Sequence, residues 1–148
     1  QDDESKFETL TLGQPLDLGI GITGKESLTA ETVAQVRRSW QQYPDRYETI
    51  FDQIGALTQS ARTALQNGQL QELGELMNLC HGYLNALQLS TPKLEDLIHI
   101  ARSNGAVGAK LTGGGGGGSM VALCPDNGER VRKAMQAAGY KTLSVTLD

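Results

Sequence analysis

The sequence has few aromatic residues and few cysteines. Its 148 residues include one Trp, four Tyr and two Phe, so aliphatic side chains and Ala must supply most of the core. The two cysteines, Cys80 and Cys124, lie among apolar residues, and no Cys/His pair has metal-ligand spacing. This pattern favours reduced thiols in the core of a cytoplasmic protein, with a disulfide or a catalytic thiol as the less favoured alternative.

Long apolar runs and basic clusters are also missing. No segment approaches the roughly 20 apolar residues that a bilayer-spanning helix needs, and the first residues carry no signal-peptide pattern. Lys and Arg number 13 against 17 Asp and Glu, for a net charge of −4. Without a basic block, nucleic acid is not an expected partner. We therefore expect a cytoplasmic protein that binds neither nucleic acid nor a membrane.

Apolar periodicity predicts the first half of the chain. Period-two alternation within residues 7–24 favours a β-hairpin or two successive strands. Helically spaced apolar stripes then predict four helices. The first runs from Thr29 to Pro44, the second from a capping box at Asp45 and Glu48 to Gly68, the third from near Gln69, and the fourth from Thr91 to Gly105.

The second half has a run of six glycines between two segments typical of strands. The expected strands are residues 106–112 and 120–124, followed by a helix from Asp126 to Gly139 and a last strand at 140–147. This order predicts an α+β fold with helices on one face of an antiparallel sheet, ending in half of a ferredoxin-like pattern. We expect residues 1–6 to be a disordered acidic lead-in and residues 7–148 to form one domain.

The glycine run, Gly113–Gly118, has the composition of a linker but not its context. Only 30 residues follow Gly118, too few to bury a core of their own, so the run lies inside a domain. Lys110 precedes the glycines, which excludes a Walker loop, and a strand follows them, which excludes a dinucleotide fingerprint. The run therefore suits close approach to a phosphate or to another glycine-rich loop, with an ordinary flexible loop as the alternative.

The stretch KLTGGGGGGS, residues 110–119, resembles the third motif of the GHMP kinases in the form found in mevalonate kinases. Gly114 replaces the usual Ala and Ser119 the usual Cys. Residues 77–102 and 22–37 are similar to two further segments of that family, although Gln88 stands where Gly is usual and Ile22 where many members have Asp. Together these likenesses extend over nearly the whole chain.

The resemblance implies a ferredoxin-like GHMP kinase C-terminal domain without the N-terminal catalytic half, and the absence of an initial Met fits a fragment. An intact enzyme of this kind would transfer a phosphoryl group from ATP to mevalonate, with Mg²⁺. Its N-terminal half would supply the main phosphate loop and the catalytic residues. We therefore expect the chain alone to be inactive and to bind no cofactor. Expected partners are the N-terminal half and mevalonate or a related small alcohol, and a homodimer is also possible.

The resemblance also implies which residues lie near ligands. Lys110, Thr112, Gly113, Gly114, Gly115, Gly116, Gly117, Gly118 and Ser119 are expected near the ATP phosphates, with no catalytic residue and no metal ligand in this chain. Thr23 is expected on the substrate side, with a strand-end turn as the alternative reading. Lys110 could equally reach a phosphate or point to solvent, and Asn78 and His81 are expected on an exposed polar helix face. Two alternatives stay open: another GHMP small-molecule kinase, and a non-catalytic ferredoxin-like binding module.

Overall fold

Four antiparallel strands form one sheet in the order β2-β3-β1-β4. The computed structural model describes residues 10–24, 30–112 and 118–148. Strand β1 is Leu16–Ile22, β2 is Gly108–Leu111, β3 is Ser119–Leu123 and β4 is Lys141–Leu147. The central strand β1 pairs with β3 on one side and β4 on the other, and β2 pairs only with β3. This strand order confirms the ferredoxin-like expectation.

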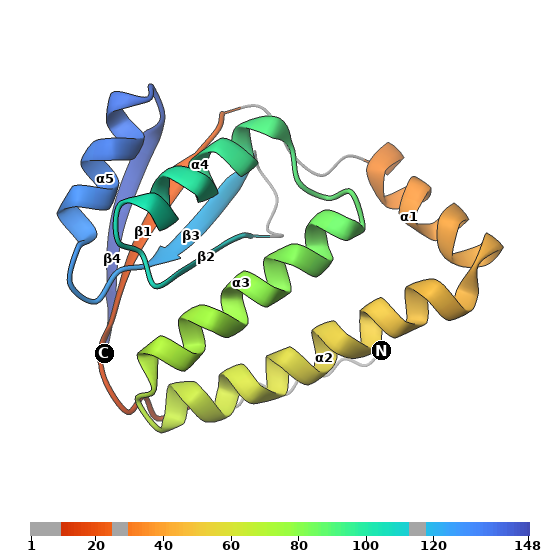
Figure 1. Cartoon of the computed structure of the whole chain (residues 1–148), viewed down its shortest axis with the longest axis horizontal. Coiled ribbons are helices and arrows are strands. Elements are labelled where there is room, and N and C mark those ends of the chain that lie inside the picture. Colours follow the sequence, from red (N-terminus) through yellow and green to blue (C-terminus); the bar gives the residue numbers. More distant parts are fainter. Residues whose placement is uncertain (1–9, 25–29, 113–117) are drawn as a thin grey trace.

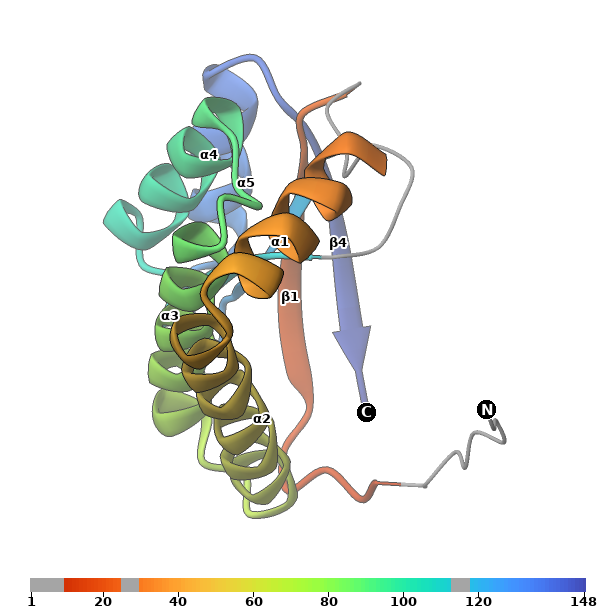
Figure 2. The ribbon, with the colours of Figure 1, turned by 90° about the vertical axis from the view of Figure 1, so that its right-hand side faces the viewer.

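The described residues also form five helices. They are α1 (Ala30–Gln42), α2 (Pro44–Gln66), α3 (Leu70–Ala86), α4 (Pro92–Ser103) and α5 (Gly128–Ala137). Helices α4 and α5 cover one face of the sheet, while α2 and α3 form a long pair beside β2 (Figure 1). Seen from the side, α2, α3, α4 and α5 lie to one side of β1 and β4, whereas α1 overlaps these strands in the view (Figure 2). The predicted α+β architecture is therefore confirmed.

The main core lies between the sheet and the helices α4 and α5. Its largest fully buried side chains are Leu97, Ile98, Met120, Met135 and Val131. Close approach depends on a glycine in β1, because a Cβ atom on Gly21 would lie 2.9 Å from Leu97 Cδ2. A second cluster joins α2 and α3 to β1 and β3 through Leu16, Ala64, Leu73 and Leu123.

Helix α3 lies directly along the free edge of the sheet at β2. A Cβ atom on Gly74 of α3 would lie 2.3 Å from the Val107 carbonyl oxygen, and one on Gly108 would lie 2.3 Å from the Gly74 carbonyl oxygen. The two backbones therefore touch, which no residue with a side chain would allow at these positions. Covering an edge strand with a helix removes a template for unwanted strand pairing.

The helix N-termini show which of the predicted N-caps are correct. Thr91 is confirmed as the N-cap of α4, since its hydroxyl accepts the Leu94 N–H at 3.2 Å. Asp45 is not the N-cap of α2: one residue, Tyr43, separates α1 from α2, and Pro44 starts the helix. Proline suits this position because its φ is fixed near the helical value. The predicted capping box is wrong as well, since Glu48 accepts a hydrogen bond from Trp40 Nε1 instead.

Two further sequence predictions need correction. Asp126 does not cap α5, whose N-cap is Asn127 without a side-chain bond. Of the predicted hairpin or two successive strands, the described residues contain one strand, β1, and residues 10–15 form none. Residues 7–9 lie outside the described residues, as does the lead-in 1–6. The partners of β1 are β3 and β4, far along the chain, so local alternation could not identify them.

Both cysteines are free thiols, as expected. Cys124 is buried with 2% of its surface exposed, and burial raises the pKa of its thiol, which suits an inert core residue. Cys80 is only partly buried. Among the described helices, none is long and apolar enough to cross a membrane.

Candidate functional site

The end of the glycine run is joined to the end of β1. The carbonyl oxygen of Gly118 accepts two hydrogen bonds from Thr23, one from its backbone N–H at 2.9 Å and one from its hydroxyl at 3.1 Å. Gly118 itself is buried. Two residues that the sequence placed on different sides of the site, phosphate and substrate, are therefore in direct contact.

The start of the glycine run is fixed by its partner across β2 and β3. The backbone N–H of Thr112 donates to the Ser119 carbonyl oxygen at 3.0 Å, and the two hydroxyl groups lie 2.7 Å apart. Gly113–Gly117 lie outside the described residues. The described part of the motif thus anchors both ends of the glycine run at one end of the sheet, with Thr23 beside them.

Lys110 lies apart from this hydroxyl cluster. Its Nζ donates to the Leu111 carbonyl oxygen at 3.0 Å, and its side chain is half-buried. It also lines a cavity of about 220 Å³ whose other lining residues are Leu57, Thr58, Ala61, Leu76, Met77 and Cys80. The lysine is therefore neither a free solvent-facing side chain nor a member of the cluster formed by Thr23, Thr112, Gly118 and Ser119.

A larger cavity, of about 680 Å³, adjoins Thr23. Thr23 and Gly24 line it from the end of β1, and Lys93 and Lys141 line it from α4 and β4. Two ammonium groups at its wall make this cavity suited to an anionic ligand. Sequence reasoning missed both lysines, because neither stands in a recognisable motif.

Asn78 and His81 are not on an exposed polar face, which corrects the sequence expectation. Asn78 Oδ1 accepts the Ala109 N–H at 3.0 Å, and His81 Nδ1 accepts the Leu111 N–H at 3.1 Å. His81 is 3% exposed. With Gly74 they follow an i, i+4, i+7 spacing on one helix face, a signal that could have indicated a face in contact with backbone.

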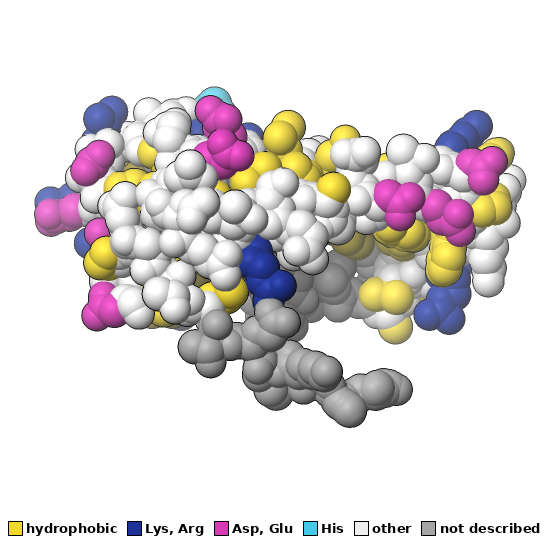
Figure 3. Space-filling view, turned by 90° about the horizontal axis from the view of Figure 1, so that it is seen from below, with side chains coloured by type: hydrophobic (Ala, Val, Ile, Leu, Met, Phe, Trp, Pro, Cys, Tyr) yellow, Lys and Arg dark blue, Asp and Glu magenta, His cyan; other side chains and the backbone are white. Residues whose placement is uncertain are grey.

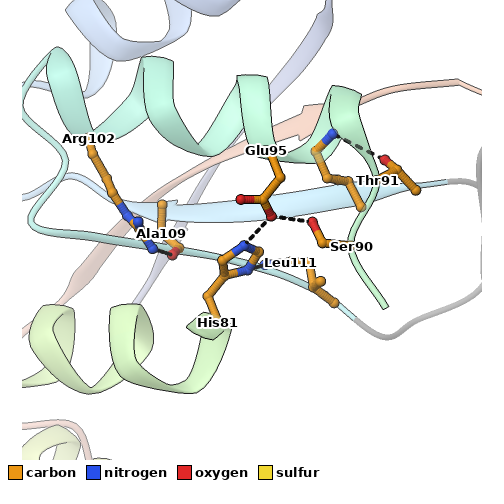
Figure 4. A network of polar contacts seen from close by, with 8 residues as sticks. His81, Ser90, Thr91, Glu95, Arg102, Ala109 and Leu111 are labelled. Carbon is orange, nitrogen blue, oxygen red and sulfur yellow. Dashed lines mark hydrogen bonds and ion pairs between the residues drawn. The ribbon is translucent and has the colours of Figure 1, made fainter. Parts of the chain in front are cut away.

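His81 belongs to a polar network that links α3, β2 and α4 (Figure 4). Its Nε2 lies 2.7 Å from Glu95 Oε2, and the same oxygen accepts a hydrogen bond from the Ser90 hydroxyl. Burial raises the pKa of the Glu95 carboxyl, but the bonds from Ser90 and His81 and the charge of Arg102 outweigh burial, so the pKa lies below its ordinary value. Glu95 is therefore a carboxylate at neutral pH.

The described residues offer no metal centre of their own. Within residues 10–24, 30–112 and 118–148, no group of three or more His, Cys, Asp or Glu side chains is placed to hold a metal ion. Charged side chains of both signs are interspersed over the face seen from below, without a continuous basic patch (Figure 3). This face therefore lacks the electrostatic footprint of a nucleic-acid site.

Comparison with known proteins identifies the class. The family described as GHMP kinases C terminal matches residues 61–141, which is more than half of the chain. The chain therefore belongs to the GHMP kinase family, of which it carries the C-terminal domain.

Within that family, two similar relatives are mevalonate kinases. The chain is 42% identical over 141 residues to the mevalonate kinase of Pyrococcus horikoshii, a match that covers 92% of this chain and 42% of the relative. It is 38% identical over 142 residues to that of Pyrococcus furiosus, covering 93% of this chain and 42% of the relative. The chain thus spans less than half the length of these relatives.

Solved structures of mevalonate kinases also resemble this chain. The structure of Leishmania major (L. major) mevalonate kinase in complex with R-mevalonate superposes with a TM-score of 0.90 and 33% sequence identity, covering 100% of this chain and 47% of that one. The mevalonate kinase of Methanococcus jannaschii gives a TM-score of 0.71 and 27% identity, covering 92% of this chain and 40% of that one.

Proposed function

We propose that this chain is the C-terminal half of a mevalonate kinase, which transfers the γ-phosphoryl group of ATP to the 5-hydroxyl of mevalonate. One observation carries the proposal: the glycine motif 110–119 is anchored beside Thr23 in a chain that is 42% identical to a mevalonate kinase. The related Leishmania major enzyme was solved with R-mevalonate, which supports the choice of substrate.

The role of this half is positioning. Phosphoryl transfer requires little covalent chemistry from the protein and depends on fixed geometry and electrostatic stabilisation. The residues on either side of the glycine run are held, Gly118 by Thr23 and Ser119 by Thr112. We propose that these anchored residues hold the motif beside the phosphate loop supplied by the other half of the enzyme.

Three lysines are relevant to the binding of anionic ligands. Lys93 and Lys141 line the cavity next to Thr23, and we propose that they attract the carboxylate of mevalonate. Lys110 is bonded to the Leu111 carbonyl oxygen, so direct contact with an ATP phosphate would require it to exchange that bond.

ATP and Mg²⁺ are the expected co-substrate and metal ion of the intact enzyme. Since the described residues bring no metal-binding group together, we expect the Mg²⁺ ligands to come from the N-terminal half and from the nucleotide phosphates. The N-terminal half is therefore the required partner. We expect the intact enzyme in the cytoplasm, and a homodimer is the assembly to be tested.

The full-length protein that contains this chain provides the test. Incubated with ATP, Mg²⁺ and mevalonate, it should release ADP in a coupled assay, whereas the 148-residue chain alone should release none. Release of ADP by the isolated chain would contradict the proposal that catalysis requires the N-terminal half. Failure of the full-length protein to turn over mevalonate would contradict the proposed function.

A panel of acceptors separates the alternatives. Homoserine, galactose and phosphomevalonate are acceptors of other small-molecule kinases of this family type, and the full-length protein should prefer mevalonate by kcat/KM. A higher kcat/KM for another member of the panel would identify a different kinase of the same family. No turnover with any acceptor would favour the non-catalytic binding module.

A further inference from the structure

Strand β2 ends where the glycine run begins, and it has a strand neighbour on one side only. An edge strand leaves alternate N–H and C=O groups without a strand partner. In β2 these groups belong to Ala109 and Leu111, and side chains satisfy all four of them. Asn78 and Arg102 bond the N–H and C=O of Ala109, at 3.0 Å each, and His81 and Lys110 bond those of Leu111, at 3.1 and 3.0 Å.

The bond from the Leu111 N–H to His81 Nδ1 is made at the last residue of β2, directly before Thr112 and the glycine run. His81 makes it from a buried position on α3, and α3 and β2 are in backbone contact at Gly74 and Gly108. Among the described strands, β2 has β3 as its neighbour on one side, and the imidazole holds the last residue of β2 from the other side.

The two hydrogen bonds of His81 also indicate which ring nitrogen accepts and which one donates. Nδ1 accepts a hydrogen bond from the Leu111 N–H, so it carries a lone pair and no proton. The ring proton is then on Nε2, which donates to Glu95 Oε2. Glu95, held by Ser90 on the other side, therefore selects the tautomer that can hold Leu111 (Figure 4). A doubly protonated ring would direct Nδ1–H against the Leu111 N–H.

We propose that His81 is a positioning residue for the end of β2: held by Glu95 as the Nε2–H tautomer, it accepts the Leu111 N–H and thereby places Thr112 and its partner Ser119, which flank the glycine run, for the binding of ATP. The first half of this statement concerns the fold, and the second rests on the proposed function. The two halves have separate readouts.

Two conservative variants separate the two bonds of the imidazole. In His81→Asn, the amide oxygen stands near the place of Nδ1 and can accept the Leu111 N–H, as Asn78 does for Ala109, but it cannot reach Glu95. In His81→Gln, the amide reaches toward Glu95 and leaves Leu111 without an acceptor. His99→Gln, at the second histidine of the chain, which is exposed on α4, is the matched control.

Steady-state kinetics of the full-length protein test the effect on the motif. His81→Gln should raise KM for ATP about fivefold, the effect of one lost hydrogen bond, with a smaller change in kcat. His81→Asn should restore KM to within about twofold of the parent protein, and His99→Gln should leave it unchanged. An equal rise in KM for both His81 variants, or no rise for either in folded protein, would overturn the role in positioning.

Spectroscopy and hydrogen exchange test the bond itself, whether or not the full-length protein phosphorylates mevalonate. In full-length protein labelled with ¹⁵N-histidine, His81 should show the chemical shifts of the Nε2–H tautomer. Exchange of the Leu111 amide, followed by mass spectrometry, should be slow in the parent and in His81→Asn and faster in His81→Gln. The Nδ1–H tautomer, or equal exchange in all three proteins, would refute the proposed bond. If the parent protein showed no mevalonate kinase activity, this would refute the proposed function and leave the hydrogen bond between His81 and Leu111 unaffected.

Discussion

Glu95 illustrates how single residues in this domain are tuned by their neighbours. Its carboxylate receives hydrogen bonds from Ser90 and His81, which arrive from different segments. The side chain is 45% exposed, so solvent weakens the electrostatic part of its contribution to stability. Its main function in the fold is therefore geometric, because it orients the His81 ring.

The lowered pKa of Glu95 predicts how its contribution varies with pH. A carboxyl group whose pKa is lowered by folding stabilises the native state above its unfolded pKa, near 4.3, and the stabilisation is lost as pH falls through the folded pKa. The stability advantage of the parent chain over Glu95→Gln should thus be constant from pH 7 to 5 and shrink below about pH 4.3. Urea midpoints at pH 7, 5, 4 and 3 measure it.

Glu129 serves as the control for this experiment. It is an exposed carboxylate paired with Lys133 across one helical turn, and such pairs contribute little to stability. Glu129→Gln should stay within about 0.5 kcal/mol of the parent at neutral pH. If the parent chain kept its full stability advantage over Glu95→Gln at pH 3, this would contradict the assignment of a lowered pKa to Glu95.

Among the contacts between helices and strands, the one between α3 and β2 leads to the clearest prediction about stability. Gly74→Ala would place a Cβ atom 2.3 Å from the Val107 carbonyl oxygen, so the helix or the edge strand must shift. We expect a loss of about 1–3 kcal/mol in the free energy of unfolding, the range for overpacked sites. Chemical denaturation of the 148-residue chain provides the measurement.

Gly82, two turns further along α3, is the matched control. A Cβ atom there would meet nothing within 4 Å, so the higher helix propensity of Ala should stabilise the chain by up to about 1 kcal/mol. The same substitution on the same helix should therefore have opposite signs at the two sites. If both variants were stabilised, the backbone contact between α3 and β2 would not exist as described.

The elements could be predicted from the sequence where the signal is local. The apolar stripes gave every described helix, and Thr91 with Pro92 marked the start of α4 correctly. Asp45 and Asp126 were misassigned because each lies within two residues of a helix start set by other residues. The pairing of β1 with β3 and β4, by contrast, depends on contacts far apart in sequence, and local alternation contains no information about them.

The candidate site was predictable in part for the same reason. A contiguous motif revealed Thr112, Gly118 and Ser119, and the family resemblance added Thr23. Asn78 and His81 were misjudged because their partners are backbone N–H groups of β2, for which the sequence contains only the indirect signal of their spacing with Gly74. Lys93 and Lys141 come together only through the fold.

For the whole molecule, the core lies on the side of the sheet covered by α4 and α5. Leu97 on α4 is fully buried, whereas Leu143 on β4 is 56% exposed. We expect Leu97→Ala to cost about 2–5 kcal/mol of stability and Leu143→Ala less than about 1 kcal/mol. Equilibrium unfolding of both variants checks this asymmetry, and equal losses would place the core on both faces of the sheet.

The identity of the reaction product tests the central claim most directly. ³¹P NMR of the full-length protein with ATP, Mg²⁺ and R-mevalonate follows the γ-phosphoryl group without a coupling enzyme. The claim that this domain is half of a mevalonate kinase predicts ADP and a phosphomonoester on the 5-hydroxyl of mevalonate in equal amounts. Inorganic phosphate in place of the ester, or unchanged ATP, would contradict it.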